Sequence, residues 1–232
     1  MATKIEYLDG KRLYNAIEIG IKNLIVHQKT LDEINVFPVP DGDTGTNMVF
    51  TLMPILTDLK DNISDRVDDT MLLIANTALE SARGNSGTII AQFYYGLSKS
   101  FHGLEKIDIH QFSKGLMQGY ESAIDSLVKP EVGTIITVMR DVANKAEALS
   151  REGCVDFVPF VREIFKESEH SLKLTKTILK ILKKSDVVDS GALGFVLLIQ
   201  GVLNSLEQGR GGRIQTTHLD ISYELEKIES LN

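Results

Sequence analysis

Helical periodicity runs through almost all of this 232-residue chain, and it limits the possible folds more than any other feature of the sequence. Apolar residues recur three and four positions apart, and no stretch of strict alternation competes with this pattern for more than a few residues. The clearest apolar stripe is formed by Ile135, Val138, Met139, Val142, Ala146 and Leu149. The charged residues between them fall on the other face of the same predicted helix. The sequence therefore predicts an all-α fold.

The pattern predicts a short extra turn over residues 175–183 and eight long helices, over residues 9–30, 46–60, 68–81, 86–101, 108–128, 134–151, 156–174 and 191–207. The connections between the long helices are short, so neighbouring helices should run in opposite directions. The predicted architecture is an antiparallel eight-helix barrel or bundle. An apolar fraction of 43% is enough for one sizeable core.

Residues 1–208 are expected to form one domain, and residues 209–232 to lie outside it. The sequence Gly-Arg-Gly-Gly-Arg begins at residue 209 and is typical of a linker. The polar stretch that follows is either the start of a further segment or a terminal segment docked on the domain, and the pattern allows both.

The sequence Pro-Val-Pro-Asp-Gly-Asp-Thr-Gly-Thr-Asn-Met, residues 38–48, predicts a stiff loop that leads into a helix. Asp41 and Asp43 project from this loop, and two carboxylates at this spacing suit a hard cation such as Mg²⁺. The N–H groups at Thr46 and Asn47 would face an anion at the start of the helix. A solvated turn without metal is the alternative interpretation.

Three other clusters of small residues also precede predicted helices: residues 83–88, 133–134 and 189–192. In an alternating bundle, the second, fourth, sixth and eighth helices begin at the same end, and these are the helices that follow the four motifs. The sequence thus predicts a pocket with open N–H groups for a nucleoside triphosphate. Taken singly, each cluster is equally an ordinary helix cap. Arg83 is a candidate phosphate clamp or an ordinary surface residue.

Composition excludes several other classes of protein. A net charge of −7 gives no basic footprint for nucleic acid. The longest apolar stretch, residues 194–203, is too short for a membrane span, and the N-terminus shows no apolar signal-peptide core. A single cysteine, Cys154, excludes an intrachain disulfide framework and fits a cytoplasmic protein. No Walker motif is present.

The motifs at residues 35–48, 82–87, 133–134 and 187–191 resemble those of the N-terminal, ATP-binding domain of fatty acid kinase, within the dihydroxyacetone kinase L-subunit (DAK2) superfamily. The resemblance extends from about residue 8 to about residue 208. It implies an antiparallel α-helical barrel that binds ATP, or ADP after transfer, with two Mg²⁺ ions at one end.

At the matching positions of the motif, Asp41 and Asp43 resemble the Mg²⁺ ligands of the superfamily. These two aspartates and Arg83 are the candidate catalytic residues. The L-subunits have a third aspartate where this chain has Val36, and the neighbouring Asn35 is the candidate third ligand. The candidate nucleotide-binding residues are Thr44, Gly45, Thr46, Asn47, Ser86, Gly87, Gly133, Thr134, Asp189, Ser190 and Gly191. The L-subunits have histidine in place of Thr44, so this residue favours the fatty acid kinase branch.

The resemblance implies transfer of the ATP γ-phosphoryl group to a fatty acid carboxylate that is presented by a separate fatty-acid-binding partner protein. A carboxylate acceptor is ionised near neutral pH, so the reaction needs no general base. One alternative is a kinase for a small ketone or polyol, and another is a nucleotide-binding module without activity of its own. The oligomeric state stays open, with a homodimer as one alternative.

Overall fold

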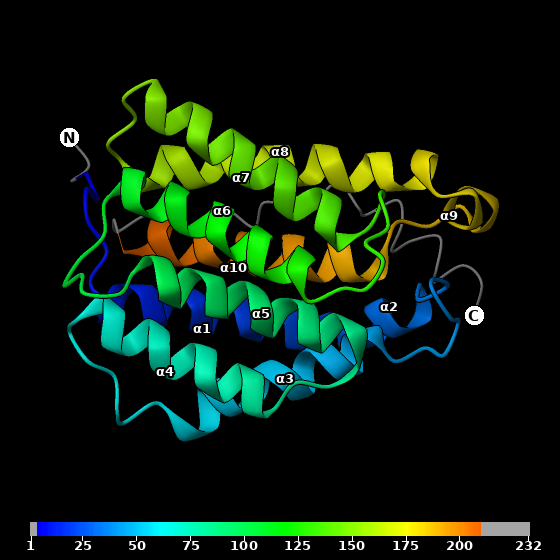
Figure 1. The fold of residues 1–232 in the computed structure, drawn as a ribbon, viewed down its shortest axis with the longest axis horizontal. Helices are drawn as coiled ribbons and strands as arrows, with labels where there is room; N and C mark the ends of the chain where they lie inside the picture. Colours follow the sequence, from blue (N-terminus) through cyan, green and yellow to red (C-terminus); the bar gives the residue numbers. More distant parts are fainter. Residues whose placement is uncertain (1–3, 210–232) are drawn as a thin grey trace.

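The structure is a computed structural model that describes residues 4–209, and the secondary structure of these residues is helical apart from one isolated bridge between Leu8 and Ile107 (Figure 1). The predicted linker or further segment therefore lies, from residue 210 on, outside the described residues. The helices are α1 (Gly10–Val26), α2 (Gln28–Glu33), α3 (Thr44–Asp58), α4 (Val67–Glu80), α5 (Gly84–Ser100), α6 (Ile109–Asp125), α7 (Ile135–Arg151), α8 (Phe157–Ile178), α9 (Lys180–Ser185) and α10 (Ser190–Gln208).

The eight long helices correspond to the eight predicted ones, which confirms the all-α fold class, and two boundaries differ by more than three residues. The first predicted helix is interrupted at His27, whose backbone leaves the helical path, and continues as the short α2. α8 extends to Ile178, beyond its predicted end, because Thr175 is buried and its hydroxyl oxygen accepts a hydrogen bond from the Asp189 N–H at 3.1 Å. The extra turn was therefore predicted too early, and it forms α9.

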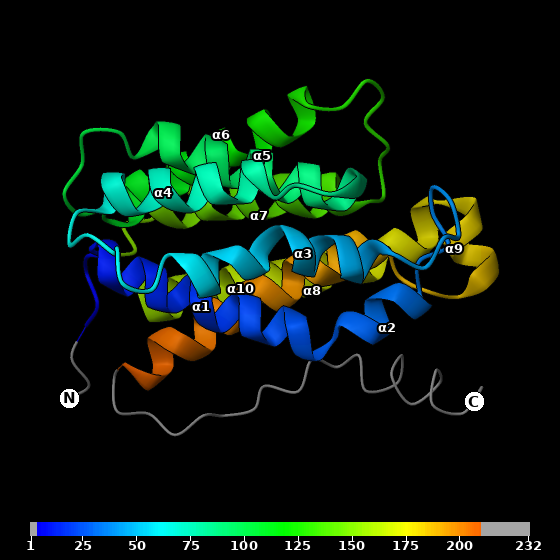
Figure 2. The ribbon, with the colours of Figure 1, turned by 90° about the horizontal axis from the view of Figure 1, so that it is seen from below.

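The long helices form a closed ring in which each packs against its neighbours and α10 packs against α1. Figure 2 shows this ring from the side, with α4, α5, α6 and α7 in one layer and α1, α3, α8 and α10 in the other. The contact between α1 and α10 is close because Gly20 and Gly201 face each other. A Cβ atom on Gly201 would clash with the backbone of Gly20. The sequence separation of this pair shows that ring closure is a long-range contact, which local periodicity cannot predict.

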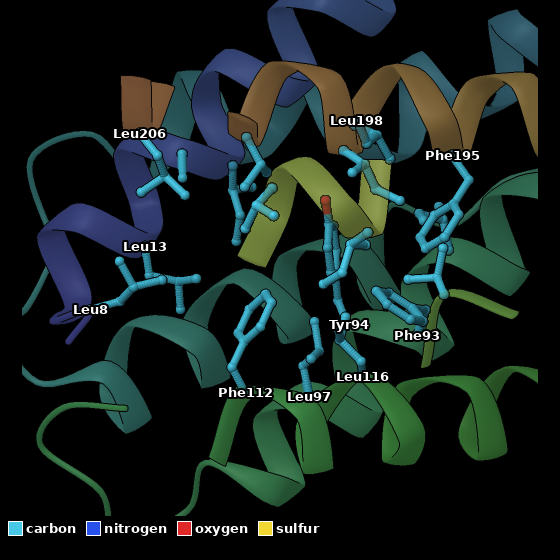
Figure 3. Close-up of a pocket in the computed structure, with 18 residues that line it drawn as sticks. Leu8, Leu13, Phe93, Tyr94, Leu97, Phe112, Leu116, Phe195, Leu198 and Leu206 are labelled. Atoms are coloured by element: carbon cyan, nitrogen blue, oxygen red, sulfur yellow. The ribbon is translucent and has the colours of Figure 1, made fainter. Parts of the chain in front are cut away.

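The centre of the ring is a packed apolar core with a cavity of about 80 Å³. Figure 3 shows side chains of α1, α5, α6 and α10 pointing into this cavity, among them Leu13, Phe93, Phe112 and Phe195. Phe93 packs edge-on against Phe195 with ring centroids 5.1 Å apart. The interior is thus filled by side chains, and the larger hollows lie elsewhere.

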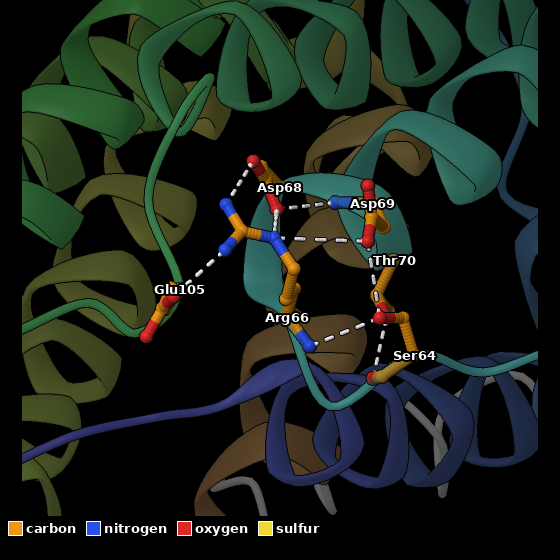
Figure 4. A network of polar contacts seen from close by, with 6 residues as sticks. All are labelled: Ser64, Arg66, Asp68, Asp69, Thr70 and Glu105. Carbon is orange, nitrogen blue, oxygen red and sulfur yellow. Dashed lines mark hydrogen bonds and ion pairs between the residues drawn. The ribbon is translucent and has the colours of Figure 1, made fainter.

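Arg66 joins two connections at the end of the bundle opposite the starts of α3 and α5 (Figure 4). Its guanidinium group donates to Asp68 at 2.8 Å and to Glu105 at 2.9 Å, and so ties the connection before α4 to the one before α6. Pairing with Arg66 holds the pKa of Asp68 below its usual value. Exposed ion pairs contribute little singly, so this network mainly fixes the geometry of the loops.

Within the described part of the chain, α10 is the one helix long and apolar enough to cross a bilayer, by length and composition alone. Of its apolar window, 67% is buried by the surrounding helices. This burial is what is expected of a core helix that is enclosed by other helices.

Candidate functional site

The four polar helix starts lie at one end of the ring, where α3, α5, α7 and α10 begin (Figure 1). A cavity of about 200 Å³ lies between them, and it is lined by Pro38, Thr44, Asn85, Ser86, Lys129, Glu131, Thr134, Ile135, Asp189, Gly191 and neighbouring apolar residues. The alternation of the helices thus brings together segments that are far apart along the chain. The structure shows, however, that not all of their N–H groups are open.

The start of α3 is capped by Asp32 at the end of α2. The Asp32 carboxylate accepts hydrogen bonds from the Thr46 N–H at 2.9 Å and from the Thr46 hydroxyl at 2.7 Å. The same hydroxyl oxygen accepts a hydrogen bond from the Gln28 side chain at 3.0 Å. Both polar groups of Thr46 are therefore used within the protein, facing α2. Asp32 was not predicted from the sequence, because its partner lies 14 residues away and no local motif includes it.

The start of α5 packs against α3 through small residues. The Ser86 hydroxyl donates to the Thr44 carbonyl at 3.4 Å, and the Asn47 side chain lies against Gly84, whose φ of +59° favours glycine. Gly87 likewise packs closely on the Thr51 hydroxyl. The N-cap residue of α5 makes no side-chain hydrogen bond to the helix start. The first turn of α5 is consequently the best placed of the four to bind an anion.

Arg83 does not join the cavity. Its guanidinium carbon lies 5.6 Å from the centroid of the Phe50 ring, on an exposed face of α3, and its backbone N–H donates to the Thr51 hydroxyl at 3.1 Å. The predicted catalytic candidate is thus held in a cation–π contact beside the site.

Asp189 caps two helices at once. One of its carboxylate oxygens accepts hydrogen bonds from the N–H of Ile135 at 3.0 Å and from the N–H of Ala192 at 2.9 Å. Burial raises the pKa of Asp189 to about 6, while the two N–H groups act in the opposite direction. The expectation of open N–H groups at the starts of α7 and α10 is therefore wrong for these two donors, because a carboxylate of the protein already occupies them.

The remaining predicted residues at these two starts have mixed surroundings. The Ser190 hydroxyl donates to the Leu31 carbonyl at 2.6 Å and so faces α2. The Thr134 hydroxyl donates to the Glu131 carbonyl at 2.8 Å. Gly133 has a φ of +93°, and a Cβ atom there would lie 2.8 Å from Ile178 of α8. These contacts explain the residue types by packing and capping alone.

Gly191 is different, because it lines the cavity and no protein atom requires a glycine there. A Cβ atom on Gly191 would lie 3.5 Å from its nearest neighbour, the Asp189 carboxylate, which is an ordinary contact distance. Gly45, in contrast, packs so closely on the Gln28 carbonyl that a Cβ atom would clash. The space in front of Gly191 is therefore left open by the chain itself.

The three candidate metal ligands lie together on the loop before α3, next to the cavity but outside its lining. The Asn35 amide nitrogen donates to the Asp41 carboxylate at 2.7 Å, and Asp43 is the N-cap residue of α3. Asn35 is 5% exposed, and its amide oxygen is buried without a hydrogen-bond partner. No group of three or more His, Cys, Asp or Glu side chains suited to a metal exists among residues 4–209. The unpartnered amide oxygen of Asn35, whose amide nitrogen contacts Asp41, nevertheless fits a hard cation, which prefers oxygen ligands.

Residues 38–204 match the family model of the DAK2 domain. An uncharacterized protein of Staphylococcus saprophyticus is 37% identical over 205 residues, which cover 88% of this chain and 37% of that protein. Protein YloV of Bacillus subtilis is 36% identical over 203 residues, which cover 88% of this chain and 36% of YloV. The chain thus spans little more than a third of the length of these curated relatives.

The fold also matches a crystal structure of the dihydroxyacetone kinase from C. freundii in complex with AMP-PNP and Mg²⁺, with a TM-score of 0.64 and 15% identity. The match covers 88% of this chain and 35% of that one. The native form of the same enzyme matches with a TM-score of 0.63. At this level of identity, the likeness concerns the fold.

Proposed function

This chain belongs to the DAK2 domain family, and from that premise we propose that it is a kinase domain that binds Mg²⁺ and ATP in the cavity between the starts of α3, α5, α7 and α10. The main support for this proposal is that residues from all four polar helix starts line one common cavity of about 200 Å³. The crystal structure of dihydroxyacetone kinase that shares this fold contains AMP-PNP and Mg²⁺, which supports the same pair of ligands here.

In this proposal the phosphates lie against the first turn of α5, at Asn85 and Ser86. This turn lacks a side-chain cap, whereas carboxylates already occupy N–H groups at the other three starts. Thr44 and Thr134 line the same cavity from α3 and α7. Thr46 and Ser190 act by positioning, because their side chains hold α2 against the site. The open space at Gly191 admits the nucleotide close to the backbone of α10.

Asp41, Asp43 and Asn35 would hold Mg²⁺, and the resemblance found in the sequence implies two such ions. The bound metal supplies positive charge that offsets the charge of the phosphates. Because the Asn35 amide oxygen has no partner in the protein, binding a cation there would break no hydrogen bond of that atom. Two aspartates that are two residues apart, on a stiff loop leading into α3, would hold their carboxylates in place without a reorganisation of the helix.

The proposed acceptor is the carboxylate of a fatty acid held by a partner protein, and the proposed compartment is the cytoplasm. A carboxylate oxygen attacks the γ-phosphorus of ATP, the bond to the β,γ-bridging oxygen breaks, and the products are an acyl phosphate and ADP. A carboxyl group with a pKa of about 4.3 is ionised near neutral pH, so no residue of the chain must remove a proton. Support for this acceptor comes from the sequence resemblance and from Thr44, which stands where the L-subunits have histidine.

A kinase for a small ketone or polyol is the second candidate, and the fold similarity to dihydroxyacetone kinase favours it. A hydroxyl acceptor must lose a proton during transfer, unlike a carboxylate. The two candidates share the nucleotide site and differ only in the acceptor, so one assay with both acceptors separates them.

The nucleotide site is tested by calorimetric titration of Mg²⁺·AMP-PNP into the wild-type chain and into Asp41→Asn and Asp43→Asn. Asp61→Asn is the matched control, because Asp61 is an exposed aspartate beyond the other end of α3. We expect each site variant to weaken binding at least ~10-fold, which corresponds to about 1.4 kcal/mol. Wild-type affinity for Mg²⁺·AMP-PNP in both site variants would refute the proposed metal site.

The acceptor is tested by transfer of labelled phosphate from ATP, with either a fatty acid on a lipid-binding protein or dihydroxyacetone present. Labelled acyl phosphate supports the main proposal, and labelled dihydroxyacetone phosphate the second candidate. Tight nucleotide binding with neither product would leave a nucleotide-binding module, the third alternative from the sequence.

A further inference from the structure

The corner between α8 and α9 is the most basic part of this acidic chain. Residues 173–184 contain five lysines and no acidic residue, so the rest of the chain carries a net charge of −12. Lys176 pairs with Asp186 at 3.7 Å. Lys180, Lys183 and Lys184 are exposed and form no ion pair within residues 4–209. The corner therefore presents unneutralised positive charge on one side of a negatively charged molecule.

The same corner exposes aliphatic side chains. Leu174, Ile178 and Ile181 are each 41–42% exposed. The adjoining connection between α6 and α7 adds Val128, which is fully exposed, and Val132. The two segments are in contact, because Gly133 lies against Ile178. We call residues 173–184 together with Val128 and Val132 the basic corner.

The basic corner lies beside the candidate nucleotide site. α9 lies at the end of the ring where α3, α5, α7 and α10 begin (Figures 1 and 2). Lys129, next to Val128, lines the cavity between these helix starts. Whatever covers the basic corner therefore also lies close to the mouth of that cavity.

The residue types of the basic corner distinguish a lipid surface from a protein partner. Protein interfaces are enriched in aromatic residues and arginine and depleted in lysine. Residues 173–184 contain no aromatic residue and no arginine. Lysines interleaved with large aliphatic residues are typical of segments that bind in the interface of an anionic bilayer, where the lysines contact headgroups and the aliphatic side chains enter between them.

We propose that the basic corner docks this domain on an anionic lipid surface, with the mouth of the cavity next to the membrane. The remaining charge of −12 is repelled by the same surface, so the charge asymmetry also orients the molecule. Each lysine near an anionic leaflet contributes roughly a fivefold gain in binding. This docking needs no nucleotide and no acceptor, and it stands independently of the proposed kinase activity.

The test is co-sedimentation of the purified chain with vesicles of equal parts phosphatidylglycerol and phosphatidylcholine, and with vesicles of phosphatidylcholine alone. The variant Lys180→Glu/Lys183→Glu/Lys184→Glu is compared with Lys60→Glu/Lys106→Glu/Lys114→Glu. The control changes the net charge equally, at three exposed lysines towards the opposite end of the ring. We expect binding to the anionic vesicles only, weakened about 100-fold in the corner variant and much less in the control.

Two further measurements test the electrostatic and the apolar contributions to vesicle binding separately. Raising the salt from about 0.1 M to about 1 M shortens the screening length from roughly 10 Å to roughly 3 Å and should release most of the protein. Ile181→Ser should weaken vesicle binding without changing the charge. Circular dichroism checks that the variants fold, which is expected because every substituted side chain is exposed.

Equal vesicle binding by the corner and control variants would overturn the proposal, and so would equal binding to neutral vesicles. If neither variant changes vesicle binding but the corner variant loses phosphate transfer with a lipid-binding protein, the corner binds a protein partner instead. A chain that binds anionic vesicles through the corner but fails to bind Mg²⁺·AMP-PNP would refute the kinase proposal and leave this one intact.

Discussion

Asp189, the N-cap residue of α10, accepts a hydrogen bond at 3.0 Å from the backbone N–H of Ile135, the first residue of α7. The same oxygen accepts the Ala192 N–H of its own helix at 2.9 Å. A single buried oxygen thus fixes the starts of two helices that both line the candidate nucleotide site. Loss of this oxygen should therefore affect both helix starts together.

Asp189→Ala should be less stable than Asp189→Asn. The amide oxygen of asparagine can accept the same two N–H groups, whereas alanine leaves both donors buried without a partner. Each lost cap costs about 1 kcal/mol, so the two variants should differ by about 2 kcal/mol in the free energy of unfolding. Urea denaturation followed by circular dichroism measures this difference, and equal stability would show that water or a rearranged loop replaces the carboxylate.

The stability of the wild-type chain relative to Asp189→Asn should depend on pH. The folded pKa of about 6 lies above the ordinary value of 3.8, so between these two values the folded state binds more protons than the unfolded state. The resulting stabilisation is complete below about pH 4 and is lost as the pH rises through 6. Wild type should therefore lose about 3 kcal/mol relative to the asparagine variant between about pH 4 and about pH 7. A difference that is flat across this range would contradict an elevated pKa.

Gly191→Ala should fold normally and bind nucleotide poorly. A Cβ atom meets no protein atom closer than 3.5 Å, and alanine favours a helix over glycine by about 0.5–1 kcal/mol, so the melting temperature should hold or rise. The added methyl group would occupy space at the cavity and lower the affinity for Mg²⁺·AMP-PNP at least ~10-fold.

Gly45→Ala serves as the contrast, because a methyl group there clashes with the Gln28 carbonyl. This variant should lose about 1–3 kcal/mol of stability. If Gly191→Ala kept wild-type affinity in calorimetry, the nucleotide would have to lie away from the start of α10.

Asp32→Ala should destabilise the start of α3. It removes the acceptor of the Thr46 N–H and hydroxyl bonds, at a cost of about 1–3 kcal/mol. Asp32→Asn should recover part of this loss, because the amide oxygen can still accept one of the two bonds. Urea denaturation should place the free energy of unfolding in the order wild type, Asp32→Asn, Asp32→Ala, and calorimetry measures nucleotide binding by the same proteins. Unchanged stability and unchanged binding in both variants would mean that α2 contributes nothing to the site.

Asn35→Asp should make stability depend on Mg²⁺ more strongly. In the absence of a cation it places a buried carboxylate beside Asp41, and like charges about 4 Å apart at an effective dielectric constant of about 20 cost about 4 kcal/mol. With Mg²⁺ the added charge becomes favourable, so the rise in melting temperature on adding Mg²⁺ should exceed that of wild type. Asn62→Asp, an exposed substitution beyond α3, is the control. An equal response to Mg²⁺ in all three proteins would argue against Asn35 as a ligand.

The eight long helices were predictable because each rests on a local pattern of apolar residues and turn residues. Short connections make neighbouring helices run in opposite directions, so every second long helix begins at the same end. The four polar motifs precede these helices, and their common end was therefore also predictable. Their common cavity follows from these two facts. The site residues within it stay predictions until ligands are tested.

The surroundings of the site residues were not predictable from the same patterns. Asp32 lies 14 residues from Thr46, Asp189 lies 54 residues from Ile135, and Ser190 lies 159 residues from Leu31. No local pattern specifies such pairs, because they depend on which helices pack together after the ring closes.

The sequence by itself determined the helices, their alternation and the end of the bundle at which the polar motifs gather, because these depend on local periodicity and chain connectivity. Only the tertiary structure decided which N–H groups remain open, that Arg83 packs on Phe50, and that the Asn35 oxygen is unpartnered. The physical reason is that a buried polar group must find a partner wherever the packed chain provides one, and that choice is made in three dimensions.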